Sequence, residues 1–324
     1  MRIVHFNQTD PKVPDDLVGA LHAFPQVTLL ATGNPDELPT ALAGSEILIV
    51  NNRSYDPGNA KIIRDNAASL RWIQFSTSGT DNGAKNGFPS GVVVTNVAGL
   101  RAFSVAEQAL VLMLALVRQV HAIEKARDRT DWCRDAITPA MDNLAGKHLV
   151  IIGMGAVGQD VARKAKAFDM RVTGVTRAKG EMRHVDRLRP RSDLAAACAE
   201  ADMVLIAATH DPTTDKFFGR EALAGMKPTA YVINVARGQL VDEPALIEAL
   251  QAKKIAGAGL DVTFDEPTPK DHPFWKMPNV VLSPHVGGAG SAGTGGGLGA
   301  IFADNLNLWL KGEPLTKVVI SNTP

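Results

Sequence analysis

Residues 148–168 read HLVIIGMGAVGQDVARKAKAF, an apolar strand followed by a glycine turn and a helical pattern. The glycines of the turn have the spacing GxGxxG. In such a turn the first glycine permits the tight bend, the second lets the backbone approach a pyrophosphate, and the third lets the helix pack on the strand. The helix N-terminus then offers N–H groups to the phosphates. We therefore predict a dinucleotide site here. Its residues are Gly153, Gly155, Ala156, Val157 and Gly158.

The end of the next strand indicates which dinucleotide fits. Folds that bind NAD place an acid about 20 residues after the glycines, where it binds the ribose 2′-hydroxyl. Here the strand RVTGV runs into Thr176 and Arg177, without an acid. A cation at this place pairs with a 2′-phosphate. We therefore predict that Thr176 and Arg177 bind the cofactor and that NADP(H) is preferred over NAD(H). The alternative is a solvated Arg177.

Short β-branched runs alternate with helical segments along the whole chain. Most are continuously apolar, as strands buried on both faces are, and βαβ spacing favours parallel sheets. Eleven runs are too many for one sheet, so we predict an α/β fold with two Rossmann-like, doubly wound parallel-sheet domains. The expected strands are residues 2–5, 27–30, 47–50, 72–75, 92–95, 149–152, 172–175, 204–207, 231–235, 257–261 and 280–283.

Composition excludes several classes of partner. Of the 324 residues 45% are hydrophobic, and 34 Lys and Arg balance 34 Asp and Glu, so no bulk charge favours nucleic acid or an anionic membrane. The longest apolar run, residues 109–117, is too short to span a bilayer. Cys133 and Cys198 form neither a metal pattern nor a disulfide framework. The start of the chain lacks the pattern of a signal peptide. We expect a cytoplasmic protein without a metal.

Two further segments stand out. Residues 104–118 are apolar almost all round, which predicts a helix buried on every side, between domains or between subunits. Residues 287–299 read GGAGSAGTGGGLG. This tract is either a mobile surface loop, or a hinge or close approach to a ligand.

Three later segments each follow an expected strand, where α/β sheets bind ligands. They place Arg237 in INVARG, Glu266 in LDVTFDEP and His285 in LSPH. Arg binds a carboxylate in a bidentate manner, His transfers protons near neutral pH, and a neighbouring Glu favours the imidazolium. Hydride transfer on a 2-oxo acid needs these three functions. Taken singly, each residue is also compatible with a solvated or structural role.

The order of these motifs resembles the D-isomer-specific 2-hydroxyacid dehydrogenase family, over most of the chain. The resemblance implies that Arg237 binds substrate, that Glu266 pairs with the acid–base His285, and that Asp261 lies near the nicotinamide amide. The motifs that carry it are Gly153–Gly158, Asn234-Val-Ala-Arg237-Gly238, Leu260-Asp261-Val262 with Glu266-Pro267, Ser283-Pro284-His285, Asn96 with Gly99, Val105-Ala106-Glu107, and Asn305 with Gly312-Glu313-Pro314-Leu315.

By the same resemblance, residues 1–99 plus 287–324 form a flavodoxin-like substrate domain. Residues 100–286 form the dinucleotide-binding domain. The apolar helix at its start helps to build a homodimer in the family, where some relatives also bring an aromatic such as Trp132 toward the partner subunit. For Trp132 we favour packing at the interface.

The substrate contacts rest on two loops of the first domain. The family uses backbone N–H groups after the fourth strand for the substrate carboxylate, which here implies Ser78 and Gly79. Arg53 follows the third strand and is a candidate for a second anionic group, or a solvated residue. Leu100-Arg101 and Ala208-Thr209-His210 depart from the usual family pattern, which puts the substrate pocket in doubt more than the chemistry.

Together these features predict reduction of a small 2-oxo acid, of the glyoxylate or hydroxypyruvate kind, to the D-2-hydroxy acid. His285 acts as acid and base. The alternative is a non-enzymatic dinucleotide sensor or corepressor on the same fold, since fold does not determine function.

Overall fold

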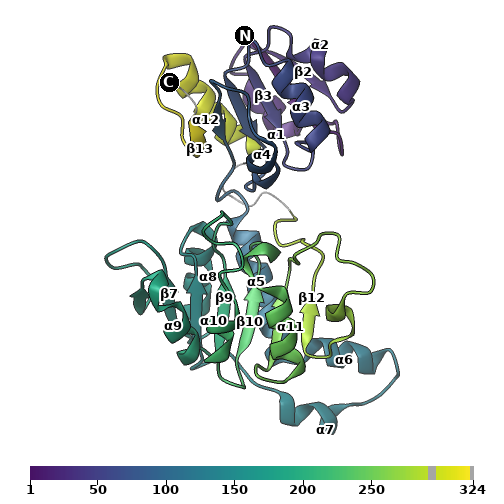
Figure 1. Ribbon diagram of the computed structural model, residues 1–324, viewed down its shortest axis with the longest axis vertical. Coiled ribbons are helices and arrows are strands. Elements are labelled where there is room, and N and C mark those ends of the chain that lie inside the picture. The colour runs from purple at the N-terminus through teal and green to yellow at the C-terminus, as the bar shows by residue number, and fades with distance from the viewer. Residues whose placement is uncertain (291–296, 322–324) are drawn as a thin grey trace. The chain divides into compact units, whose positions relative to one another are not determined.

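The computed structural model describes residues 1–290 and 297–321. Its contacts divide the chain into two compact units, Met1–Arg101 with Ser291–Pro324, and Ala102–Gly290. Both are shown in Figure 1. The glycine tract at 287–299 lies partly outside the described residues.

The first unit is built on a six-stranded sheet in the order β13-β5-β4-β3-β1-β2. The run β2-β1-β3-β4-β5 is parallel and has the flavodoxin-like strand order, while β13 is an antiparallel edge strand on β5. The strands are β1 (Arg2–Phe6), β2 (Thr28–Thr32), β3 (Ile47–Val50), β4 (Trp72–Phe75), β5 (Val93–Thr95) and β13 (Val318–Ser321).

Helices cover both faces of this sheet. One core contains side chains of α2 and α3, and the other contains side chains of α1 and α12. In the second core Trp72 stacks on Phe302 with ring centroids 5.0 Å apart. The helices are α1 (Asp15–Leu21), η1 (Pro35–Glu37), α2 (Leu38–Leu42), α3 (Pro57–Asp65), α4 (Asp81–Asn86) and α12 (Leu298–Lys311).

The second unit has a seven-stranded, wholly parallel sheet in the order β12-β11-β10-β9-β6-β7-β8. The order reverses between β6 and β9, which is where doubly wound sheets bind ligands. The strands are β6 (His148–Ile152), β7 (Arg171–Val175), β8 (Arg187–Arg189), β9 (Met203–Ile206), β10 (Tyr231–Asn234), β11 (Gly257–Leu260) and β12 (Val280–Leu282).

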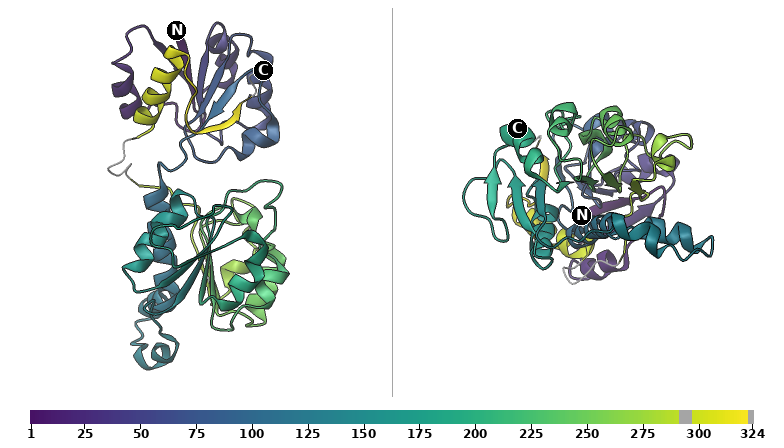
Figure 2. Two further views of the ribbon diagram at one scale, coloured as in Figure 1. Left: turned by 90° about the vertical axis from the view of Figure 1, so that its left-hand side faces the viewer. Right: turned by 90° about the horizontal axis from the view of Figure 1, so that it is seen from below.

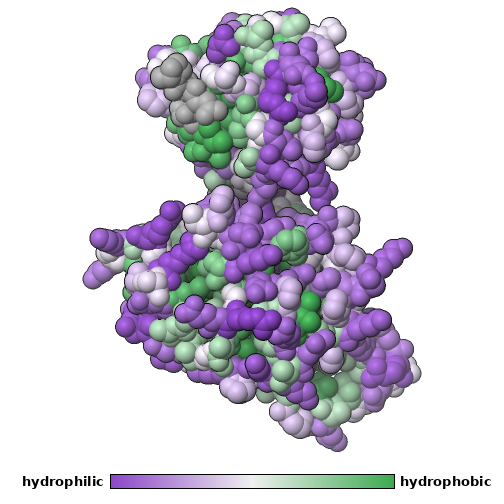
Figure 3. Space-filling model, viewed as in Figure 1, coloured by the Kyte–Doolittle hydropathy of each residue, from purple (hydrophilic) through white to green (hydrophobic). Residues whose placement is uncertain are grey.

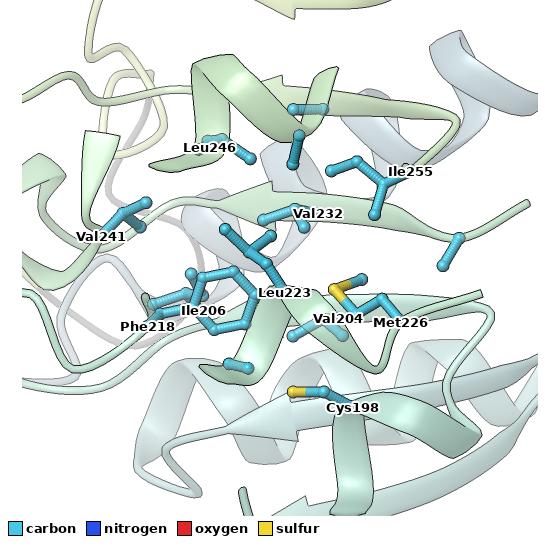
Figure 4. Close-up of a cluster of buried hydrophobic side chains, with 14 of the residues drawn as sticks. Cys198, Val204, Ile206, Phe218, Leu223, Met226, Val232, Val241, Leu246 and Ile255 are labelled. Carbon is cyan, nitrogen blue, oxygen red and sulfur yellow. The ribbon is translucent and has the colours of Figure 1, made fainter. Parts of the chain in front are cut away.

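Two helical layers enclose this sheet, as the left view of Figure 2 shows. One face carries α9, α10 and α11, and Figure 4 shows part of the core between these helices and the sheet. The other face carries α5 and α8. The helices are α5 (Ala102–Val117), α6 (Val120–Arg127), α7 (Arg134–Ile137), η2 (Thr138–Ala140), α8 (Ala156–Lys166), η3 (Arg191–Asp193), α9 (Leu194–Glu200), α10 (Arg220–Ala224), η4 (Gly238–Leu240), α11 (Glu243–Gln251) and η5 (Pro273–Lys276).

The predicted fold class is confirmed, and each expected strand is present within two residues of its bounds. Two edge strands were not expected. The three residues of β8 include two arginines, so they lack the apolar run that marks a buried strand. The strand β13 pairs antiparallel, outside the βαβ pattern.

The helix α5 is only partly covered within the single chain, so its predicted burial between domains or subunits stays a prediction. It packs on β10, β11, β12 and α8, but Val111 is 56% exposed. On the face in Figure 3, hydrophobic residues occur in separate groups among hydrophilic ones. In the described part of the chain no single helix is long and apolar enough to cross a membrane. Only α5 and α6 together reach that length and hydropathy, and they are bent by 67°.

Candidate active site

The glycine turn after β6 has the geometry that a dinucleotide requires. Gly153 has φ 96°, and a Cβ on it would lie 2.6 Å from the Ala208 backbone, at the reversal between β6 and β9. A Cβ on Gly158 would lie 2.1 Å from the Gly153 carbonyl oxygen. Around Gly155, by contrast, no atom lies within 4 Å of an added Cβ. Two glycines are thus needed for packing, and the second leaves open space at the N-terminus of α8.

The N-terminus of α8 suits a pyrophosphate. Gly155 is its N-cap and supplies no capping side chain, so the N–H groups of the first turn remain available to an anion. Ala156 and Val157 are the first two residues of that turn. These residues therefore fit a nicotinamide dinucleotide.

The loop after β7 carries the expected cation. Arg177 is exposed, and the half-buried Thr176 donates its backbone N–H to the Arg189 carbonyl oxygen at 3.0 Å. Asp211, in the loop after β9, accepts hydrogen bonds from the Thr213 hydroxyl and N–H. Those bonds lower the pKa of Asp211, and the charges of Arg177 and Arg191 lower it further. The carboxylate of Asp211 is therefore close enough to Arg177 for their charges to interact.

The three candidate catalytic residues follow the adjacent strands β10, β11 and β12. Arg237 lies in a turn where the Asn234 amide donates to the Arg237 carbonyl oxygen at 2.9 Å. The next residue, Gly238, lies against Thr263, because an added Cβ would be 2.0 Å from the Thr263 carbonyl carbon. This close contact brings the turn with Arg237 against the segment that leads to Glu266.

Glu266 and His285 are joined by a short hydrogen bond. The distance between His285 Nδ1 and Glu266 Oε2 is 2.6 Å, and Glu266 Oε1 accepts the Thr263 N–H at 3.4 Å. Burial acts to raise the pKa of Glu266. The His285 hydrogen bond and charge, the Thr263 N–H and the charge of Arg237 outweigh it, so the pKa of Glu266 is lowered. Glu266 is therefore ionised at neutral pH. The peptide bond from Glu266 to Pro267 is cis.

Asp261 lies at the end of β11 and is only 2% exposed. Its Oδ1 accepts the Ser283 hydroxyl at 2.5 Å and the Val286 N–H at 3.1 Å. Its Oδ2 accepts the Gly287 N–H at 2.8 Å. Asp261 thus organises the loop that carries His285. Its expected place beside the nicotinamide amide stays a prediction.

The predicted substrate loops lie at the carboxyl edge of the first unit's sheet. Ser78 and Gly79 follow β4, and neither N–H donates to another of the described residues. The exposed Arg53 follows β3. Asn52 joins the two loops, since its N–H donates to Thr77 Oγ1 at 3.2 Å. The loops after β3 and β4 are therefore hydrogen-bonded to each other at the carboxyl edge of the sheet, where the N–H groups of Ser78 and Gly79 are available as donors.

Two residues near His285 were not among the predicted site residues. Gln108, on α5, donates to Ser283 Oγ at 2.8 Å and to Asp261 Oδ1 at 3.4 Å. An amide in a largely apolar helix was the available signal. Ser283 was noted only as part of a motif. Within the described ranges, no group of three or more His, Cys, Asp or Glu residues could hold a metal ion.

Comparison with known proteins agrees with this geometry. The family profile "D-isomer specific 2-hydroxyacid dehydrogenase, NAD binding domain" matches residues 110–287. The chain is 35% identical over 255 residues to glyoxylate reductase of Thermococcus gammatolerans, covering 77% of this chain and 76% of that one. It is 32% identical over 319 residues to D-3-phosphoglycerate dehydrogenase of Methanocaldococcus jannaschii, covering 96% of this chain but only 58% of the relative's length.

A solved structure extends the likeness to the fold of the whole chain. The crystal structure of a D-isomer specific 2-hydroxyacid dehydrogenase family protein from Aeromonas salmonicida superposes with a TM-score of 0.83, at 25% identity and 98% coverage of both chains. The family and its named relatives are NAD(P)-dependent oxidoreductases that act on 2-hydroxy acids. The chain belongs to the D-isomer specific 2-hydroxyacid dehydrogenase family.

Proposed function

We propose that this protein reduces a small 2-oxo acid, of the glyoxylate or hydroxypyruvate kind, to the D-2-hydroxy acid. The observation that carries the proposal is the 2.6 Å contact between His285 and an ionised Glu266. This pair follows β11 and β12, at the same sheet edge as the glycine turn after β6, because all seven strands are parallel. The glyoxylate reductase similarity supports the substrate class.

His285 is the proposed acid for the substrate oxygen. With Glu266 ionised, the proton on Nδ1 is held between the two side chains, which orients the ring and leaves Nε2 to serve the substrate. When bound, a nicotinamide cofactor would supply the hydride for the carbonyl carbon. His285 would donate the proton that the carbonyl oxygen takes up. General acid catalysis of this kind contributes about 10²–10⁴-fold.

Cations and N–H groups hold the substrate carboxylate in this proposal. Arg237 presents a guanidinium, whose fork matches a carboxylate, and its charge also helps to keep Glu266 ionised. The unused N–H groups of Ser78 and Gly79 are the proposed backbone donors. Arg53 is the proposed contact for an anionic substituent of the substrate. The predicted domains 1–99 plus 287–324 and 100–286 then have the substrate and dinucleotide roles.

The proposed cofactor is NADP(H) in preference to NAD(H). The N–H groups of Gly155, Ala156 and Val157 would hold the pyrophosphate. Arg177 is exposed in the loop after β7, where a fold that binds NAD would have an acid at the strand end. Its guanidinium would hold the 2′-phosphate. Thr176 lies beside it. The nicotinamide end would lie near Asp261.

We further infer a homodimer that uses the α5 and α6 region. Val111 is 56% exposed, Val120 is 43% exposed and Trp132 is 90% exposed in the single chain. Exposed aromatic and aliphatic side chains of this kind are typical of subunit interfaces.

The experiment is a set of absorbance assays with NADPH and NADH, each against glyoxylate, hydroxypyruvate, pyruvate and phenylpyruvate. We expect turnover with a small 2-oxo acid, faster with NADPH. His285→Ala should lower kcat about 10²–10⁴-fold with cofactor affinity retained. His22→Gln, an exposed histidine of the first unit, is the control. NADPH binding without turnover of any 2-oxo acid, or full activity of His285→Ala, would overturn the proposal.

A further inference from the structure

The loop that carries His285 is wrapped around the Asp261 carboxylate. Besides the side-chain and N–H contacts described above, the His285 N–H donates to the Asp261 carbonyl oxygen at 2.8 Å. A Cβ on Gly287 would lie 2.7 Å from Asp261 Oδ2. His285 itself has φ 54°, a left-handed conformation that is uncommon for a residue with a side chain. The surroundings of Asp261 therefore impose the backbone geometry of His285.

Ser283 is the side-chain member of this arrangement. Its hydroxyl lies 2.5 Å from Asp261 Oδ1, a distance typical of a charge-assisted hydrogen bond. On its other side Ser283 Oγ accepts a hydrogen bond from Gln108 Nε2 at 2.8 Å. Because an amide N–H donates and does not accept, the Ser283 proton has no acceptor on that side. The Ser283 proton is then directed to Asp261.

Gln108 joins this loop to a rigid element. It lies in the second turn of α5, a 16-residue helix packed on β10, β11 and β12. Gln108 is half-buried, and the residues that follow it, Ala109 and Leu110, are buried. The amide is therefore held in place by the helix and has two acceptors in reach, Ser283 Oγ and Asp261 Oδ1.

We propose that Gln108 and Ser283 are positioning residues for His285, a role that rests on the proposed function of His285 as acid. The chain of hydrogen bonds from Gln108 through Ser283 to Asp261 keeps the loop closed on β11. That closure holds the imidazole at 2.6 Å from Glu266. Neither residue contacts the reacting atoms in this proposal, so each acts on the rate through the placement of His285.

The variants separate placement from binding. Gln108→Met keeps the length of the side chain and removes the amide, and Ser283→Ala removes the hydroxyl. Because small displacements of a catalytic group cost up to about a hundredfold in rate, we expect kcat to fall about ten- to a hundredfold. KM for the 2-oxo acid and Kd for NADPH should stay within about twofold, since uniform binding is untouched.

Two further variants test specificity. Ser283→Thr keeps the hydroxyl and should restore most of kcat. The double variant of Gln108→Met and Ser283→Ala should be no slower than Ser283→Ala alone, because residues that act as one unit are not additive. The matched control is Gln119→Met. It removes another half-buried glutamine amide of the same unit, one that donates to the Leu116 carbonyl oxygen at 2.9 Å.

A second readout keeps this inference separate from the proposed function. Hydrogen exchange of the Val286 and Gly287 amides, followed by NMR in the NADPH-bound protein, reports loop closure directly. Faster exchange in Gln108→Met, but not in Gln119→Met, supports the inference even if wild type reduces no 2-oxo acid. Unchanged exchange together with unchanged kcat in Gln108→Met would overturn it. So would a loss that appears only in thermal stability, or that Ser283→Thr fails to restore.

Discussion

Gly238 lies so close to Thr263 that any side chain on it would overlap the Thr263 carbonyl group. The contact brings the Arg237 turn against the segment that leads to Glu266. We expect Gly238→Ala to push these segments apart, lower kcat/KM at least tenfold and destabilise the fold by about 1–3 kcal/mol. Steady-state kinetics and thermal unfolding measure the two effects.

The control for this prediction is Gly19→Ala. Gly19 lies within α1, where an added Cβ meets no atom within 4 Å. Alanine there should leave activity unchanged and stabilise the helix by about 0.5–1 kcal/mol. If Gly238→Ala behaved like Gly19→Ala, the two segments would not depend on close contact.

The glycines at 153 and 155 should respond in opposite ways. Gly153→Ala meets both a positive φ and the Ala208 backbone, so we expect a lower melting temperature. Gly155 has φ −74° and open space, so alanine should leave the melting temperature unchanged. It should nevertheless raise the Kd of NADPH about tenfold, since a methyl group fills space that the pyrophosphate needs. Titration and scanning calorimetry measure the Kd of NADPH and the melting temperature of both variants. If the two variants changed both quantities to the same extent, the prediction would be wrong.

Arg177 and Asp211 give a prediction about cofactor choice. Arg177→Ala should weaken NADPH about 10–100-fold, the loss of a charge-assisted contact, and leave NADH unaffected. Arg177 stabilises the ionised form of Asp211, so the two charges interact. Asp211→Asn removes a negative charge that competes with the 2′-phosphate for Arg177, and it should lower the Kd of NADPH several-fold. Ratios of kcat/KM for the two cofactors measure this at low and high salt. A similar loss for NADH and NADPH in Arg177→Ala would exclude a 2′-phosphate contact.

His5 predicts how the stability of the first unit depends on pH. It is 2% exposed and its Nδ1 has no hydrogen-bond partner among the described residues. Burial lowers the pKa of His5 below 6.5, although the charge of Asp10 opposes this. Below pH 6.5 the unfolded chain therefore takes up a proton that the folded chain resists. As the pH decreases below 6.5, the free energy of unfolding should fall by up to about 1.4 kcal/mol per pH unit, until the pH reaches the lowered pKa of His5.

Hydrogen exchange of the β1 amides between pH 5 and pH 8 measures this slope in the first unit. His5→Leu should abolish the contribution. Asp10→Asn should extend it to lower pH, because the charge that opposes the shift is gone. A slope that persists in His5→Leu would assign the effect to another group.

The sequence predicted what depends on local pattern. The apolar strand and GxGxxG spacing predicted the turn at Gly153. The strand ends predicted the positions of Arg237, Glu266 and His285, whose roles stay predictions. It did not predict contacts between distant segments, such as Gln108 with Ser283, 175 residues apart. It also missed the use of Asp261 within the His285 loop, since a carboxylate in a motif carries no sign of which N–H groups reach it.

The glycine tract shows the same limit. From sequence alone the tract at 287–299 is either a mobile surface loop, which its composition favours, or a hinge or a close approach to a ligand. Gly299 is an instance of close packing, because its Cβ would lie 2.1 Å from the Asp16 carbonyl oxygen, and its N–H donates to Asp16 Oδ2 at 2.8 Å. Residues 291–296 lie outside the described ranges.

The packing of Phe302 on Trp72 has a consequence for the order of folding. The second unit is one continuous segment, so a chain emerging from the ribosome can complete it early. The first unit waits for α12, which supplies Phe302 to its core, and for β13, which pairs with β5. Until those segments are synthesised, Trp72 lacks the ring of Phe302 and that face of the sheet is covered by α1 without α12. The nascent first unit is then the part most in need of a chaperone.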